Sequence, residues 1–112
     1  MKVSALEQAG IFTLVNRGDD PDAEISKPFC CDLLSIAMSK APAGCAWVTV
    51  MGNINTIAVA SLTEAAAIIL AEGARLDEPA GERAAAQGIY VFATDMPIFE
   101  AALAIKELSE KQ

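Results

Sequence analysis

The stretch 46-AWVTVMGNINTIAVASL-62 decides the fold. Its first six residues form a short apolar run of the kind expected for a buried strand. Gly52 and Asn53 interrupt this run, and apolar residues at helical spacing then predict a helix from about residue 54 to 62. Apolar strands that alternate with helices are typical of α/β folds, because the crossover helices cover both faces of the sheet.

The same alternation continues along the rest of the chain. Helices are predicted at residues 3–9, 32–40, 79–87 and 97–109, and strands at 11–15, 25–31, 66–72 and 89–94. Pro28 breaks the strand at 25–31, which favours a mixed sheet. We therefore expect one domain, residues 1–112, folded as a three-layer α/β/α sandwich with a mostly parallel or mixed sheet of about five strands.

Composition restricts the function classes. The formal net charge of −7 opposes binding to nucleic acid, whose affinity depends on cationic contacts. The longest apolar run, Ala65 to Ala71, is too short to span a membrane, and the N-terminus does not resemble a secretory signal, so a cytoplasmic location is expected. The sequence contains no histidine and no phosphate-binding loop, so neither a catalytic constellation nor a cofactor is predicted.

The cysteines and the acidic loop contain residue types that can bind metals or carry out redox chemistry. Cys30, Cys31 and Cys45 lack the spacing of a zinc site, and buried or inert thiols are the favoured interpretation. The carboxylates of residues 18–24 lack the spacing and the glycine of an EF-hand loop, so a solvated turn is expected there. No metal site is predicted.

Residues 22–35, DAEISKPFCCDLLS, resemble the pattern D-R-x-I-T-G-G-x-x-x-D-L-L-S that gives the DRTGG domain its name. Residues 46–62 resemble the tryptophan-containing strand and N-x-x-A-V-A helix of the same family, and the resemblance extends over nearly the whole chain. It implies a three-layer α/β domain similar to the N-terminal domain of HPr kinase/phosphorylase, often dimeric, with a regulatory or interaction role.

The signature itself is largely replaced in this chain. Ala23, Ser26, Lys27 and Pro28 stand where the family has arginine, threonine and two glycines. A ligand role of these family positions is therefore not carried over.

The start of the helix at 54–62 is the candidate ligand site. Ligands of open α/β sheets gather at the carboxyl ends of strands, where helix N-termini can receive anions. The helices at 32–40, 79–87 and 97–109 begin beside carboxylates, whereas this one does not. The candidate residues for a nucleotide or other anion are Gly52, Asn53, Asn55, Thr56 and Asp32. The alternative is that Asn53 or Asn55 only caps this helix and that Asp32 caps the helix at 32–40.

The helices at 54–62 and 97–109 carry wider apolar surfaces than one sheet contact can bury. The surplus predicts either a homodimer or deep burial within one protomer. The leading hypothesis is a non-enzymatic regulatory or interaction module that binds itself and an unidentified protein partner. The alternative is a small-ligand sensor that binds a nucleotide or another anion near residues 52–56.

Overall fold

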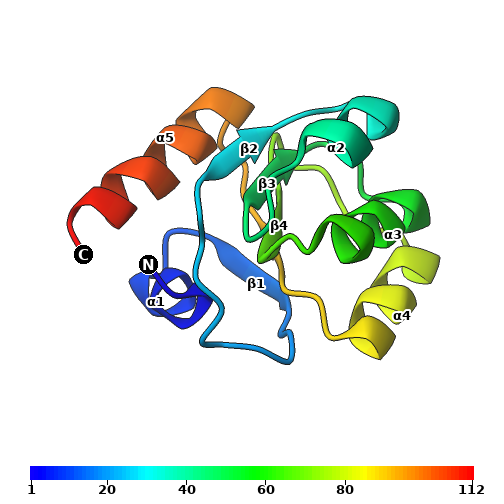
Figure 1. Ribbon diagram of the computed structural model, residues 1–112, viewed down its shortest axis with the longest axis horizontal. Helices are drawn as coiled ribbons and strands as arrows, with labels where there is room; N and C mark the ends of the chain where they lie inside the picture. The colour runs from blue at the N-terminus through cyan, green and yellow to red at the C-terminus, as the bar shows by residue number, and fades with distance from the viewer.

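The computed structural model describes residues 1–112 as five helices around one five-stranded sheet (Figure 1). The helices are α1 (Val3–Ala9), α2 (Leu34–Lys40), α3 (Ile54–Thr63), α4 (Glu78–Gln87) and α5 (Ile98–Glu110). The strands are β1 (Thr13–Asn16), β2 (Pro28–Cys30), β3 (Ala46–Thr49), β4 (Ala67–Leu70) and β5 (Val91–Ala93). Every predicted helix and strand is present; α1 has the predicted bounds, and the ends of the other elements are shifted.

The sheet is mixed, as expected, but the reason differs from the prediction. Its order is β1-β5-β4-β3-β2, with β2 to β5 parallel and only β1 antiparallel to its neighbour. The broken strand β2 is thus part of the parallel portion. Pro28 is tolerated because it is the first residue of an edge strand, where a missing N–H group removes no ladder hydrogen bond.

Helices cover both faces of the sheet, which confirms the three-layer sandwich. One core packs α2, α3 and α4 against buried side chains that include Trp47, Ile68 and Leu70. The other packs α1 and α5 against the opposite face, where Val48 and Ile69 are buried. Figure 1 shows α1 and α5 on one side of the strands and α2 to α4 on the other. All residues of β3 and β4 are buried, as their uninterrupted apolar sequences predict.

The three crossovers that join the parallel strands place their helices on the same face, and the strand order runs from β2 to β5 without reversal. The sheet therefore lacks the point of reversal at which doubly wound folds open a ligand crevice. Strands β2 to β5 all finish at one end of the sheet, which we call the carboxyl end. We call the opposite end the amino end. In Figure 1 the amino end is at the bottom. No helix is both long and apolar enough to cross a membrane.

Candidate functional site

Asp32 does not cap α2, so that prediction is wrong. The cap position belongs to Leu33, which offers no side-chain hydrogen bond. The Oδ1 atom of Asp32 instead accepts hydrogen bonds from the Thr49 hydroxyl at 2.7 Å and from the Val50 backbone N–H at 2.9 Å. Because β2 and β3 are neighbours, a residue just beyond β2 faces the end of β3. Asp32 therefore ties together the ends of two strands.

Asn53 caps α3, as the capping alternative predicted. Its side-chain Oδ1 accepts from the Thr56 backbone N–H at 3.1 Å and from the Thr56 hydroxyl at 3.4 Å. Thr56 is buried, whereas Asn55 is exposed to solvent. The first turn of α3 contains no acidic residue, and the amide group of Asn55 is free of intramolecular hydrogen bonds.

Gly52 allows another part of the chain to approach the start of α3. A Cβ atom at this position would lie 2.0 Å from the Arg75 carbonyl oxygen. The Asp77 backbone N–H also donates to the Gly52 carbonyl at 2.9 Å. The loop between β4 and α4 thus packs directly on Gly52, which explains why a side chain is absent there.

Asp77 and Asp95 were both expected to supply charge at helix starts. Asp77 caps α4 by accepting from the Ala80 N–H at 2.9 Å. Asp95 does not cap α5, whose cap position is Pro97. Asp95 instead lines a cavity of about 240 Å³ at the carboxyl ends of β4 and β5, together with Arg75 and Thr94.

The structure brings the candidate residues to one region without enclosing a cavity between them. Asp32, Asn53 and Thr56 engage in the hydrogen bonds described above, and Asn55 presents its side chain to solvent. None of the five candidate residues lines one of the three cavities of the molecule. Ligand binding at this end would therefore take place on an open surface.

The environments of two of the three cysteines oppose thiolate chemistry. Burial raises the pKa of the Cys45 thiol to about 11. Partial desolvation, and secondarily the charge of Asp32, raises the pKa of the Cys30 thiol. Reactive thiols have lowered pKa values, so both shifts oppose thiolate chemistry. The Cys31 thiol donates to the Leu33 carbonyl at 3.3 Å, and no group of three or more potential metal ligands converges.

The wide apolar surfaces predicted for the helices at 54–62 and 97–109 are buried to different extents in the structure. In α3, Ile57, Val59 and Ala60 are buried, and the helix packs between α2 and α4. Burial within one protomer is therefore the correct interpretation for most of α3. In α5, which packs beside β2 and β3, Phe99 and Leu103 remain exposed.

Three further apolar side chains, Leu33, Ile36 and Val50, are exposed on the segments that follow β2 and β3. α5 packs beside β2, and Figure 1 shows the start of α5 at the same end of the sheet as the end of β2. Val50, whose N–H binds Asp32, lies beside them at the end of β3. We call this group the carboxyl-end apolar patch: Leu33, Ile36, Val50, Phe99 and Leu103. Leu33, Ile36 and Val50 were not predicted as surface residues, because apolar letters in short elements are typical of the core.

A solved structure of similar fold is the regulatory region of Clostridium perfringens pyrophosphatase, comprising CBS and DRTGG domains in complex with the activator diadenosine tetraphosphate. The TM-score is 0.74 at 14% sequence identity, over 94% of this chain and 45% of that one. The chain has a DRTGG-like fold.

The likeness of this DRTGG-like domain to the pyrophosphatase region is one of fold, since 14% identity shows no more than that. No protein-family model matches the sequence, and no curated protein is significantly similar to it. The weak sequence signal agrees with the altered signature. In the structure, Lys27 and Pro28, which replace the two glycines, stand at the start of β2.

Proposed function

We propose that this DRTGG-like domain is a non-catalytic regulatory module that forms a homodimer through the carboxyl-end apolar patch and acts on a partner protein. The exposure of Phe99 carries the proposal, because 69% of this large side chain is open to solvent in the isolated protomer. Leu33, at 57% exposure, adds a second large apolar side chain from another element. Removal of apolar surface from water is favourable by about 25 cal/mol per Å², and association keeps the part of this gain that exceeds its entropic cost.

The position of the patch supports an interface. Its members come from α5, from Leu33 and Ile36 at the start of α2, and from Val50 just after β3; α5 packs on one core of the sheet and α2 on the other. Such a surface needs little ordering when it associates, which lowers the entropic cost of binding. The fold likeness to a regulatory region supports the regulatory part of the proposal.

Sedimentation velocity with charge substitutions tests the dimer. Phe99→Asp would bury a carboxylate in the proposed interface, so we expect this variant to be monomeric at micromolar concentration while its helical content stays unchanged. Leu62→Asp is the matched control. Leu62 is 70% exposed and lies near the end of α3, outside the patch. A monomeric wild-type protein, or equal dissociation of both variants, would reject the proposed interface.

Nucleotide or anion binding at the start of α3 is the second candidate function. It is supported by the carboxylate-free first turn of α3, by the free amide of Asn55, and by the fold likeness to a region whose activator is a nucleotide. A helix N-terminus carries about half a positive charge and attracts anions.

Thermal unfolding with diadenosine tetraphosphate, AMP and phosphate tests this second function. Ligand at about 100 times its Kd would stabilise the folded state by about 2.7 kcal/mol. Asn55→Asp should abolish the shift, since it adds negative charge to the first turn. Gln8→Glu adds the same charge at an exposed position of α1 and should leave the shift intact. A shift retained in Asn55→Asp would place the ligand elsewhere, and no shift in the wild type would reject binding.

A further inference from the structure

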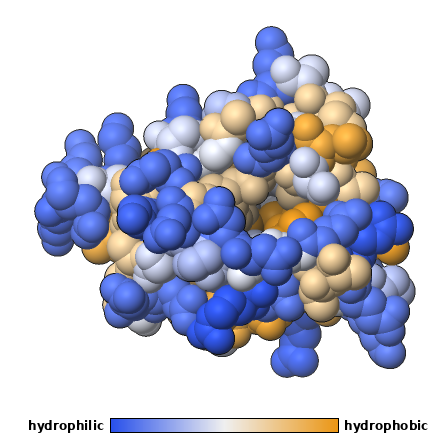
Figure 2. All heavy atoms as spheres, turned by 60° about the horizontal axis from the view of Figure 1, so that its bottom comes forward, coloured by the Kyte–Doolittle hydropathy of each residue, from blue (hydrophilic) through white to orange (hydrophobic).

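The largest cavity lies at the amino end, on the opposite side of the molecule from the carboxyl-end apolar patch. It encloses about 420 Å³, within the range of about 300–1,000 Å³ that is usual for small-molecule sites. It lies among the starts of β3, β4 and β5, the ends of α3 and α4, and the acidic loop before β2. Figure 2 brings this end forward and shows hydrophilic side chains around an apolar hollow.

The lining of the cavity is electronegative. Ser61 and Glu64 reach it from the end of α3, and Gln87 and Gly88 from the end of α4. Each helix C-terminus carries about half a negative charge. The carboxylates of Asp20 and Glu64 belong to two lining residues, and no lysine or arginine lines the cavity.

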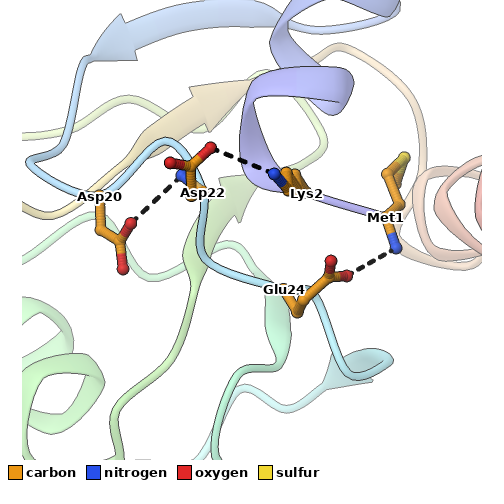
Figure 3. Close-up of polar contacts among 5 residues, drawn as sticks. All are labelled: Met1, Lys2, Asp20, Asp22 and Glu24. Carbon is orange, nitrogen blue, oxygen red and sulfur yellow. Dashed lines mark hydrogen bonds and ion pairs between the residues drawn. The ribbon is translucent and has the colours of Figure 1, made fainter.

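Three cationic groups on the N-terminal segments are paired with other acids. The N-terminal ammonium group binds Glu24 at 3.1 Å, and Lys2 binds Asp22 at 3.4 Å (Figure 3). Arg17 is paired with Glu7.

The carboxylates of the cavity have no such partners. The Asp20 carboxylate accepts only the Asp22 backbone N–H, at 3.2 Å, and Glu64 forms no ion pair. Both residues are exposed, so the cavity presents two unpaired carboxylates that a ligand can reach from solvent.

The floor of the cavity is apolar. It is lined by Ile89 and Tyr90, which are both buried, and by alanines of α3 and of the start of β4. A ligand that fits must carry positive charge toward the carboxylates and methylene groups toward the floor.

We propose that this cavity binds a small protonated aliphatic amine. The ammonium group pairs with the carboxylates of Asp20 and Glu64, and the hydrocarbon chain covers the apolar floor. This inference is independent of the proposed dimer, because the cavity contains no residue of the carboxyl-end apolar patch.

Titration of the full chain with cadaverine, followed by amide NMR, tests the proposal. We expect saturable shifts at residues 60–66 and 87–90. Glutarate and pentanediol, which have the same chain length without positive charge, should cause none. Glu64→Gln should weaken cadaverine binding by about three- to fivefold, as expected for the loss of an ion pair on an exposed carboxylate.

Glu72→Gln is the matched control. Glu72 shares the left-handed backbone conformation of Glu64, with a φ of 60° at both residues, but lies outside the cavity at the end of β4. Its substitution should change binding less than about twofold, as usual for a distant exposed charge. Equal weakening in the two variants would show non-specific attraction to an acidic protein and overturn the site. The absence of saturable shifts would overturn it as well.

The side chain of a lysine in another protein also carries a protonated amine on an aliphatic chain. A parallel titration with Nα-acetyl-lysine methylamide, which mimics such a side chain, tests this second kind of ligand. Tighter binding of cadaverine identifies a free amine as the ligand, and tighter binding of the lysine derivative identifies a protein side chain.

Discussion

Asp32 links two neighbouring strands through one carboxylate oxygen. It accepts the Thr49 hydroxyl and the Val50 N–H, and the Thr49 oxygen in turn accepts the Met51 N–H at 3.2 Å. This chain of hydrogen bonds directs the backbone from the end of β3 toward α3. The residue therefore positions both the start of α3 and Val50 of the carboxyl-end apolar patch.

Asp32→Ala should lower the free energy of unfolding by about 1–2 kcal/mol, because it leaves the Thr49 hydroxyl and the Val50 N–H without their acceptor. Urea denaturation measures this loss. Asp95→Ala is the control, since Asp95 caps no helix, and it should change stability by less than about 0.5 kcal/mol. Similar losses in the two variants would mean that the Asp32 hydrogen bonds contribute nothing specific.

Gly52→Ala should lower the free energy of unfolding by about 2–3 kcal/mol, because its Cβ would collide with the Arg75 carbonyl oxygen. Gly81→Ala offers a contrast inside α4. There the nearest atom to a new Cβ is Leu76 Cδ2 at 3.8 Å, so this change should stabilise the fold by about 0.5–1 kcal/mol. A neutral Gly52→Ala would contradict the tight packing of the β4–α4 loop.

The roles of Asp32 and Gly52 could not be predicted from neighbouring residues. An aspartate before L-L-S is typical of a helix cap, but its partner Thr49 lies 17 residues away and is brought close only by strand pairing. Likewise, Gly52 suggested an approach by ligand, whereas the segment that approaches is Arg75 and Leu76. Asn53 was predictable because a cap contacts residues of its own first turn.

At the scale of elements, α3 and α5 show why apolar width alone does not identify an interface. α3 is covered by α2 and α4 as well as by the sheet, so most of its wide apolar surface is buried. α5 shares its face of the sheet with the short helix α1, and Phe99 and Leu103 stay uncovered. The helical spacing of apolar residues predicted both helices. Only the arrangement of the layers in the structure shows which of the two helices retains exposed apolar side chains.

Asn53→Ala should lower the free energy of unfolding by about 1 kcal/mol, since α3 loses its N-terminal cap. Asn55→Ala should be neutral or slightly stabilising, because Asn55 is exposed and alanine favours helix. Chemical denaturation of the two variants compares them directly. Equal losses would show that Asn55, too, has a structural role at the start of α3.

At the scale of the whole molecule, the two ends of the sheet differ in character. The carboxyl end exposes the apolar patch and the carboxylate-free start of α3. The amino end holds the electronegative cavity. The fold class could be predicted from the alternation of apolar strands and helices. The difference between the two ends of the sheet could not, because it depends on which helix ends and loops the topology places together.

The sedimentation mass of the wild-type protein shows whether the chain forms a dimer. We expect a species of twice the 11.7 kDa protomer mass at micromolar concentration, which dissociates on dilution. We also expect that Phe99→Asp sediments as a protomer and Leu62→Asp as a dimer. A wild-type protein that sediments at the protomer mass up to high micromolar concentration would rule out the homodimer.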